Sequence, residues 1–234
     1  MTPREVVPGV FSVGAIDWDL RLFDELIPTP DGTSYNSYLI RGSEKTALID
    51  TVNPPMVENL TANLDRLGVE KIDYIIANHA EQDHSGSIPA MLERFRGAKV
   101  VTNAKCRDFL VDLLQISADQ VIVIEDGDTL ALGDKTLEFI IAPWVHWPET
   151  MLTYLQEDRI LFSCDFFGSH YATSSLYVPD EGVIYESAKR YYAEIMMPFR
   201  SSITAHLAKL EPRDIAMIAP SHGPIYNNPA FIMD

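Results

Sequence analysis

The six residues 79–84 constrain the fold and chemistry of this chain more than any other stretch. They read His79-Ala80-Glu81-Gln82-Asp83-His84 and follow a strand-like apolar run at residues 72–77. Potential metal ligands this close in sequence converge only where the backbone turns sharply. This favours a loop at the carboxyl end of a strand, where open α/β layers commonly bind ligands. Zinc sites rely mainly on histidine and cysteine, whereas carboxylates shift the preference toward iron or manganese. The stretch therefore indicates a binuclear, oxygen-rich metal site, with iron as the favoured metal.

The composition argues against several classes of partner. The chain has 34 acidic and 18 basic residues and a formal net charge of −16, which disfavours nucleic acids and anionic membrane surfaces. Its 234 residues suit a single domain over residues 1–234. Two cysteines are too few for a disulfide framework, and neither a signal peptide nor a membrane-spanning apolar run is visible. We therefore expect a cytoplasmic protein.

Strand and helix patterns alternate along the chain, with hairpins in both halves. Helical spacing predicts helices over residues 57–67, 85–96 (with Ser85 as N-cap), 106–114 and 187–210, the last interrupted at Pro198. Apolar and β-branched runs predict strands over residues 9–15, 34–40, 45–51, 71–78, 100–102, 121–125, 130–132, 137–142, 151–155, 159–164 and 215–219. Two of these runs, 45–50 and 159–165, are similar, because each is a buried strand that ends in Asp. The pattern favours an α/β (α+β) fold in which two packed sheets carry helices outside, a four-layer αββα sandwich.

Three later residues share the position of a ligand at the tip of a strand. His146, Asp165 and His222 each lie at or just past the end of an apolar run. Taken singly, a histidine here is more often a core or surface residue, and an aspartate a turn residue. Together with residues 79–84, they would bring four of the six histidines to one site. We interpret Asp50, in the same kind of position, as structural, and alternation turns Cys164 to the face opposite Asp165.

The complete pattern resembles that of a known family. His-x-Glu-x-Asp-His, followed by a later His, Asp and His, is similar to the metal pattern of flavodiiron proteins, a branch of the metallo-β-lactamase-fold superfamily. The wider hydrolase family carries His-x-His-x-Asp-His and usually binds zinc, so Glu81 marks the diiron branch. The resemblance extends over nearly all of residues 7–225 and implies the metallo-β-lactamase-like αββα fold.

The resemblance also implies a ligand set for two iron ions. It places His79, Glu81 and His146 on one iron, and Asp83, His84 and His222 on the other, with Asp165 bridging the pair. The family tolerates rotation of the residue at the His84 position away from the metal in favour of water, which leaves ligation by His84 open. Trp147, His170 and Tyr192 would surround the ligands, although ordinary packing explains these three equally well.

Flavodiiron proteins continue into a flavodoxin domain that carries FMN, the immediate electron donor to the irons. This sequence ends 11 residues after Gly223 (234 − 223) and shows no phosphate-cradling loop. We therefore expect no FMN on this chain and an external source of electrons. A homodimer would match the family, but its reason there, the flavin of one subunit serving the irons of the other, is missing.

Three functions are open at this point. The first is a stand-alone diiron protein that binds dioxygen as a sensor or carrier, with a chemotaxis signalling protein as a possible partner, as in flavodoxin-less relatives. The second is an O2 or NO reductase subunit supplied by a separate flavoprotein or rubredoxin. The third is a zinc-dependent hydrolase of the lactamase or glyoxalase II type, against which Glu81 argues. If the chain is an enzyme, we expect a diiron oxidoreductase rather than a hydrolase.

Overall fold

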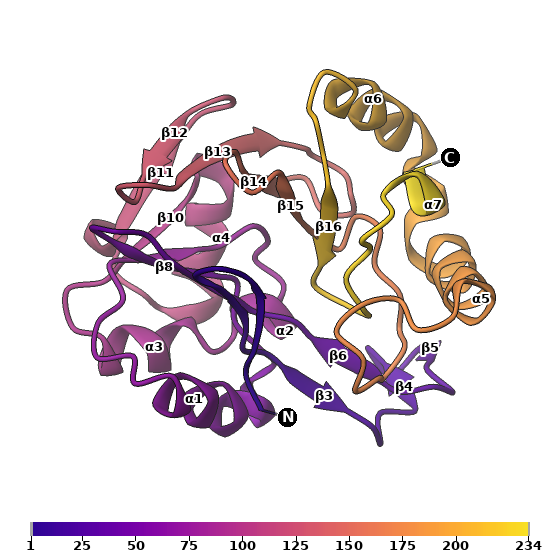
Figure 1. Cartoon of the computed structure of the whole chain (residues 1–234), viewed down its shortest axis with the longest axis horizontal. Helices are drawn as coiled ribbons and strands as arrows, with labels where there is room; N and C mark the ends of the chain where they lie inside the picture. The colour runs from indigo at the N-terminus through magenta and orange to yellow at the C-terminus, as the bar shows by residue number, and fades with distance from the viewer. Residues whose placement is uncertain (1, 234) are drawn as a thin grey trace.

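The computed structural model describes residues 2–233, whose strands form two large sheets (Figure 1). The larger sheet is antiparallel at one edge and parallel from β8 onward. Its strands, in spatial order, are β1 (Arg4–Val7), β2 (Val10–Ser12), β7 (Tyr38–Arg41), β8 (Thr46–Ile49), β9 (Tyr74–Ile76), β10 (Lys99–Asn103) and β11 (Val121–Ile124). The parallel part brings the carboxyl ends of β8 and β9 to the same edge.

The second sheet is antiparallel except for its last pair, β15 and β16, which are parallel. Its strands, in spatial order, are β12 (Thr129–Ala131), β13 (Thr136–Ile141), β14 (Met151–Leu155), β15 (Ile160–Cys164) and β16 (Met217–Pro220). Two small antiparallel pairs complete the strands: β3 (Ala15–Asp17) with β6 (Thr33–Tyr35), and β4 (Leu22–Phe23) with β5 (Ile27–Pro28).

Both faces of each large sheet are buried, because consecutive side chains enter different cores. In β8, Leu48 packs with the helices outside the first sheet, while Ile49 packs between the sheets. In β15, Leu161 packs toward the helices outside the second sheet, and Phe162 packs between the sheets. The predicted four-layer αββα arrangement is therefore confirmed.

The helices cover the outer faces of the two sheets. Those on the first sheet are α1 (Val57–Arg66), α3 (Ile88–Arg94) and α4 (Ala104–Leu114), and those on the second are α5 (Glu181–Tyr191) and α6 (Arg200–Leu210). Shorter turns are η1 (Pro54–Met56), α2 (Gln82–Ser85), η2 (Ala118–Gln120), the π turn η3 (Tyr192–Met196), η4 (Met197–Phe199) and α7 (Ala230–Met233). Within residues 2–233, no helix has the length and apolar character needed to cross a bilayer.

Two predicted helix starts are wrong. Ser85 does not cap a long helix: it lies inside the short α2 and its hydroxyl donates to the Ala80 carbonyl at 2.6 Å, and α3 begins only at Ile88. The helix expected from residue 187 already begins at Glu181, because the Asp180 side chain accepts a hydrogen bond from the Val183 N–H. The predicted interruption at Pro198 is confirmed by the π and 3-10 turns between α5 and α6.

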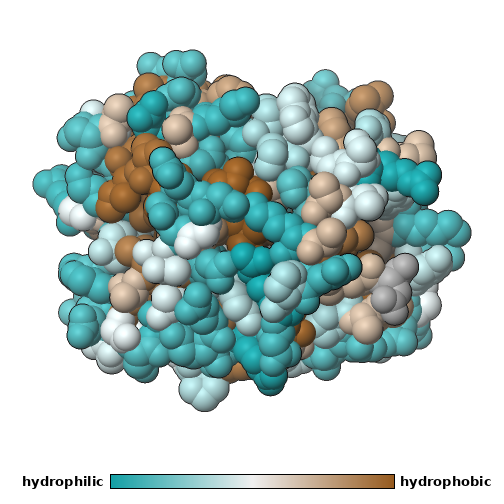
Figure 2. All heavy atoms as spheres, turned by 90° about the horizontal axis from the view of Figure 1, so that it is seen from above, coloured by the Kyte–Doolittle hydropathy of each residue, from teal (hydrophilic) through white to brown (hydrophobic). Residues whose placement is uncertain are grey.

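Hydrophilic residues dominate the face seen in Figure 2, with separate apolar patches between them. The buried apolar residues form three cores around the two sheets. The sheets therefore form a rigid support for the loops at their ends.

Candidate metal centre

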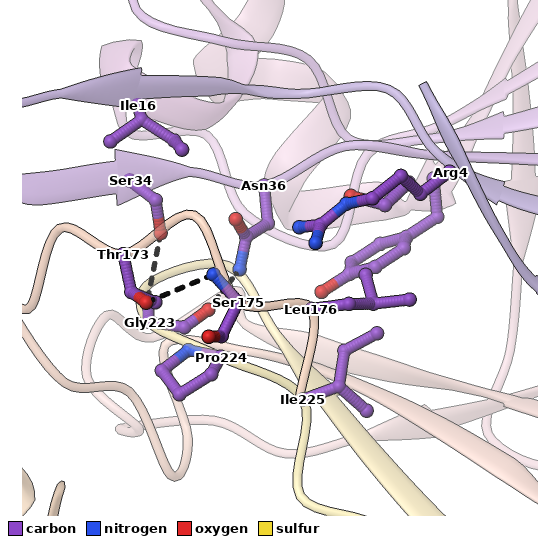
Figure 3. A pocket seen from close by; sticks show the side chains of 12 residues that line it. Arg4, Ile16, Ser34, Asn36, Thr173, Ser175, Leu176, Gly223, Pro224 and Ile225 are labelled. Atoms are coloured by element: carbon purple, nitrogen blue, oxygen red, sulfur yellow. Dashed lines mark hydrogen bonds between the residues drawn. The ribbon is translucent and has the colours of Figure 1, made fainter. Parts of the chain in front are cut away.

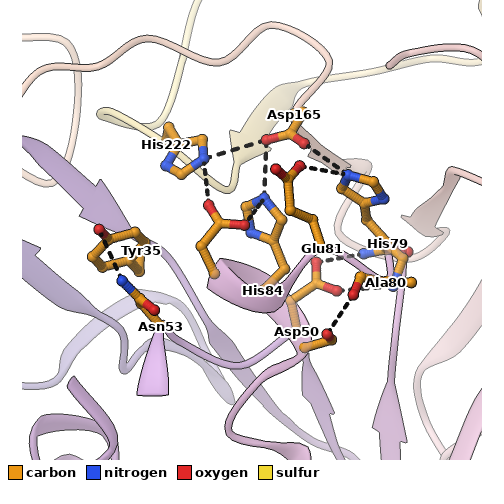
Figure 4. Close-up of polar contacts among 12 residues, drawn as sticks. Tyr35, Asp50, Asn53, His79, Ala80, Glu81, His84, Asp165 and His222 are labelled. Carbon is orange, nitrogen blue, oxygen red and sulfur yellow. Dashed lines mark hydrogen bonds and ion pairs between the residues drawn. The ribbon is translucent and has the colours of Figure 1, made fainter. Parts of the chain in front are cut away.

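The predicted ligands lie on loops at strand ends from both large sheets. β9 leads into the loop with His79 and Glu81, and α2 follows with Asp83 and His84. In the second sheet, the other three candidates follow β13, β15 and β16. Figure 4 shows the side chains of His84, Asp165 and His222 pointing toward one another.

The first group consists of His79, Glu81, His146 and Asp165, each of which offers one ligand atom within 4.8 Å of the others. His146 Nε2 lies 3.1 Å from Glu81 Oε2 and 3.3 Å from Asp165 Oδ2. His79 Nε2 lies 3.1 Å and 3.4 Å from the same two oxygens. Two imidazole nitrogens and two carboxylate oxygens thus face one point, a donor set that suits a transition-metal ion.

The second group consists of Asp83, His84 and His222, whose ligand atoms also lie within 4.8 Å of one another. His222 Nε2 is 3.1 Å from Asp83 Oδ2 and 3.3 Å from Asp165 Oδ1. His84 Nε2 is 3.0 Å from Asp165 Oδ1 and 3.4 Å from Asp83 Oδ1. The structure therefore turns the imidazole of His84 toward this group.

Asp165 is shared between the two groups through different oxygens. Oδ2 faces the histidines of the first group, and Oδ1 faces those of the second. Burial alone would raise the pKa of the Asp165 carboxyl, but His84, His146 and His222 outweigh burial and hold the pKa well below its ordinary value. Asp165 is thus an ionised carboxylate positioned between two sets of donors.

The buried polar atoms of this site fit a pair of cations. Both oxygens of Asp83, and Oδ2 of Asp165, are buried without a hydrogen-bond partner among residues 2–233. Such acceptors are costly unless a cation or donor compensates them. Burial would lower the pKa of His146 and His222, yet the neighbouring carboxylates raise these pKa values to about 9 and about 10. The site therefore attracts positive charge at both positions, which metal ions would supply in place of protons.

Contacts behind the site fix the orientation of two imidazoles. Glu149 is 1% exposed, and its Oε1 accepts from His79 Nδ1 at 2.7 Å and from the Ala80 N–H at 3.0 Å. His222 Nδ1 lies 2.7 Å from the Ser34 carbonyl oxygen. In both rings a proton held on Nδ1 leaves Nε2 free to face the site, as is usual for histidines that bind metals.

The segment that carries His222 is anchored from the N-terminal half of the chain. Asn36 Nδ2 donates to the carbonyls of Pro220 (2.8 Å) and Gly223 (2.7 Å), and the Gly223 N–H donates to Ser34 Oγ (2.8 Å). Ser34, Asn36 and Gly223 line a small pocket of about 20 Å³, shown in Figure 3, which has room for about one water molecule. The pocket thus serves to hold the His222 loop rather than to bind a cofactor.

The loop with His146 is held by α6. His206 Nε2 donates to the Pro143 carbonyl at 2.8 Å, and Lys209 Nζ donates to the Ile141 carbonyl at 2.8 Å. Trp144 stacks on Phe199, with ring centroids 6.0 Å apart and an interplanar angle of 18°. α6 therefore positions a ligand candidate that lies far from it in sequence.

Comparison with known proteins identifies the family. A family model described as "ODP family beta lactamase" matches residues 33–223, which include all seven predicted ligands. The chain belongs to this family. It is 40% identical to "Type A flavoprotein fprA" of Rhodobacter capsulatus over 95% of this chain and 52% of that protein, and 39% identical to "Nitric oxide reductase" of Moorella thermoacetica over 96% and 57%. The solved "rubredoxin oxygen:oxidoreductase" of Desulfovibrio gigas superposes with a TM-score of 0.94 at 30% identity, covering 98% of this chain and 58% of that one.

The predicted resemblance to flavodiiron proteins, and with it the metallo-β-lactamase-like fold, is confirmed by these matches. The chain spans about half the length of the curated relatives it matches. The family match over residues 33–223 includes both groups of candidate ligands.

Of the three residues predicted around the ligands, two contact them and one does not. The Trp147 ring lies edge-on to His79 at 5.0 Å, and the His170 ring lies 4.8 Å from that of His222. Tyr192 is 38% exposed, whereas the neighbouring Tyr191 is buried and donates its hydroxyl to Asp165 Oδ1 at 2.9 Å. Helical phase could have distinguished the two tyrosines, since Tyr191 falls on the buried stripe of α5.

Two further predictions concern residues at the ends of β8 and β15. Asp50 is structural as expected: it accepts from the backbone N–H of Asn78 at 2.8 Å and from its side-chain amide at 2.9 Å. The Cys164 thiol, however, does not turn away. It lies within 4.8 Å of ligand atoms of His84 and Asp165, because a φ of 50° at Cys164 breaks the alternation of the strand.

The ODP-family site opens to the surface through a cavity of about 200 Å³. Glu81 and Asp83 lie in its wall together with Leu22, Phe23 and Asp24. Burial raises the pKa of the Asp24 carboxyl, and the nearby charges of Glu81 and Asp83 raise it further. Neither Asp24 nor Glu149 was predicted as part of the site: Asp24 follows β4, a strand of only two residues, and Glu149 lies before β14 rather than after a strand.

Proposed function

We propose that this chain is a non-heme diiron domain that binds dioxygen or nitric oxide and reduces it with electrons from a separate donor protein. The observation that carries the proposal is the position of Asp165. Its two oxygens face two separate groups of histidines and carboxylates, 3.0 to 3.4 Å from their imidazole nitrogens. Two-metal sites bridged by a carboxylate are built in this way.

In the proposed site, each group of residues holds one ion. His79, Glu81 and His146 would hold the first iron, and Asp83, His84 and His222 the second, with Asp165 between them. When bound, the two ferrous ions supply electrons and open coordination positions for a diatomic ligand. Glu81 favours iron here, because a hard anionic oxygen replaces the imidazole that the zinc hydrolases have in this position.

The surrounding residues hold protons at defined atoms. The Tyr191 hydroxyl donates to Asp165 Oδ1, and Glu149 keeps a proton on His79 Nδ1. Burial and the nearby His222 lower the pKa of His170 to about 2, so this imidazole stays neutral beside the site and adds no charge to it. These contacts keep the imidazole and carboxylate donors in one geometry while electrons enter and leave.

The entrance favours a small ligand. The cavity above Glu81 and Asp83 has a volume of about 200 Å³, and Leu22, Phe23 and Tyr35 narrow it with apolar and aromatic surface. Dioxygen and nitric oxide fit such a space. Drug-sized substrates usually occupy pockets of about 300 to 1,000 Å³.

The electrons would come from outside the domain. Reduction of dioxygen to water takes up more electrons than two ferrous ions hold, so a donor must deliver the remainder and restore the ferrous pair. The matched protein of Desulfovibrio gigas is named for rubredoxin, and that of Moorella thermoacetica for nitric oxide. We propose a rubredoxin or flavoprotein as the donor of this chain. A homodimer, a chemotaxis partner and a cytoplasmic location stay predictions.

The test combines metal analysis with gas consumption. We expect about two iron atoms per chain after anaerobic loading, and continuous uptake of O2 or NO when reduced rubredoxin or a flavoprotein with NADH is supplied. A single uptake of gas without turnover would favour the oxygen-sensing role over the reductase. Zinc in place of iron, together with hydrolysis of a thioester or lactam, would refute the diiron assignment.

A further inference from the structure

A second and larger hollow lies between α5, α6 and α7, the helices that Figure 1 shows together near the C-terminus. Its volume is about 590 Å³, within the range of about 300 to 1,000 Å³ that small-molecule sites occupy. It shares no lining residue with the entrance cavity of the metal centre. We call it the α5–α6 groove, and its lining makes it a candidate site in its own right.

The walls of the α5–α6 groove are mostly aromatic and aliphatic. Phe166 and Phe167 stack with ring centroids 4.0 Å apart, and the exposed rings of Tyr185 and Tyr192 stand at its margin. The apolar lining residues are Phe166, Phe167, Tyr185, Ala188, Tyr191, Tyr192, Met196, Ile203, Leu207, Phe231, Ile232 and Met233. A concave apolar surface with a few polar groups is the usual form of a ligand site.

The charged residues that line the groove are both basic, although the chain as a whole has a net charge of −16. Arg200 forms no ion pair with any residue between 2 and 233. Lys189 lies 3.8 Å from Glu186 Oε1, and both of these side chains are more than 60% exposed, so the pair is weak. The groove therefore combines an apolar body with two cations that can accept an anionic group.

The inner wall of the groove reaches the metal centre through one side chain. The ring of Tyr191 lines the groove, while its hydroxyl donates to Asp165 Oδ1 at 2.9 Å. Phe166 and Phe167 follow Asp165 directly in the chain. A molecule in the groove would therefore pack against a residue that contacts the carboxylate shared by the two groups of ligands.

We propose that the α5–α6 groove binds an amphipathic anion of the medium-chain carboxylate class. The hydrocarbon chain packs on the aromatic and aliphatic walls, and the carboxylate meets Lys189 and Arg200. None of the seven predicted metal ligands lines the groove, so this site goes beyond the proposed function and does not require iron to be bound.

The experiment is a calorimetric titration of the whole chain with decanoate, below its micelle concentration, and with neutral 1-decanol. We expect saturable 1:1 binding of decanoate, and weaker binding of decanol. The double variant Lys189→Ala/Arg200→Ala should weaken decanoate binding about fivefold, the effect of two exposed ion pairs, without changing decanol binding. Leu207→Trp, which fills the groove, should weaken both ligands.

Matched controls separate the groove from general surface effects. Arg96→Ala/Lys105→Ala removes the same charges from exposed positions outside the groove, and Leu113→Trp adds the same ring to the exposed face of α4. Both should leave decanoate binding unchanged. The proposal is overturned if decanoate does not bind, if decanol binds equally well, or if the controls weaken binding as much as the groove variants. The double variant changes only exposed side chains, so it tests the site even if Leu207→Trp fails to fold.

Discussion

Glu149 offers the sharpest test of the metal centre, because it contacts only one of the two groups of ligands. Its Oε1 accepts from His79 Nδ1 at 2.7 Å and from the Ala80 N–H at 3.0 Å, in a site where the side chain is 1% exposed. Burial would raise the pKa of Glu149, but the bond to His79 outweighs burial and lowers it, so the group is an ionised acceptor. We predict that Glu149→Gln and Glu149→Leu lower the affinity for a metal ion in the group that contains His79. The affinity for an ion in the other group should not change.

The magnitudes follow from the two hydrogen bonds. Glu149→Gln keeps an acceptor oxygen for both donors but removes the charge, and a charged hydrogen bond exceeds a neutral one by about 1 kcal/mol. This corresponds to about a fivefold increase in the dissociation constant of one ion. Glu149→Leu also removes the acceptor and leaves the Ala80 N–H buried without a partner. Loss of such an outer contact typically costs about 10- to 100-fold in metal affinity.

The assay is a titration of the metal-free chain with cobalt(II), followed by its visible absorption and by competition with a chelator. The two ions should bind with separable dissociation constants, of which only one changes in the Glu149 variants. Glu125→Gln, an identical change at an exposed position, provides the control. Equal weakening of both ions, or no effect of Glu149→Leu, would refute the argument that this carboxylate orients His79.

Four further predictions concern the side chains of the site. Tyr191→Phe should lower the free energy of unfolding of the metal-free chain by about 1 to 2 kcal/mol in urea, because Asp165 loses a donor, whereas the exposed Tyr192→Phe should stay within about 0.5 kcal/mol. The raised pKa values of His146 (about 9) and His222 (about 10) stabilise the metal-free fold most below their unfolded value of 6.5, and this stability should be lost as pH rises through 9 to 10. Metal affinity should change in the opposite direction, rising with pH as these imidazoles lose their protons, which calorimetry in buffers of different ionisation enthalpy would show as proton release. Glu81→His should raise the ratio of zinc to iron in chains loaded from an equimolar mixture, and an unchanged ratio would contradict the role given to this carboxylate.

The positions of the predicted ligands could be predicted from the sequence because these residues lie at or just after the ends of apolar strands. His79 and Asp165 each follow a buried strand, and strand ends of one sheet meet at one edge. The strands that precede these residues belong to two sheets, and the loops at the strand ends of both sheets converge on one site (Figure 4). The layers could be predicted for a similar reason, because runs that are apolar at every position indicate sheets buried on both faces.

The contacts behind the ligands could not be predicted, because they depend on packing between distant segments. Glu149 meets His79 across 70 positions of the sequence, and Tyr191 meets Asp165 across 26. No short-range pattern marks a buried glutamate as the partner of a histidine. The position of Tyr191 on the buried face could have been predicted only from the helical phase of α5. The start of this helix was predicted at residue 187, which is too late.

Asp50 and Asp165 show how far a shared pattern determines chemistry. Both follow a buried strand that pairs in parallel with its neighbour, and both are at most 2% exposed. Around Asp50, burial prevails over the charge of His84 and the amide donors of Asn78 and raises its pKa to about 6, whereas around Asp165 the contacts with three imidazoles prevail over burial and lower the pKa. The backbone places a carboxylate in the same kind of position in each sheet, and only Asp165 lies within 3.0 to 3.4 Å of the imidazoles of both groups of candidate ligands. The strands therefore determine only the positions at which a metal ligand can lie. The function of this fold depends on which side chains the loops place next to those positions.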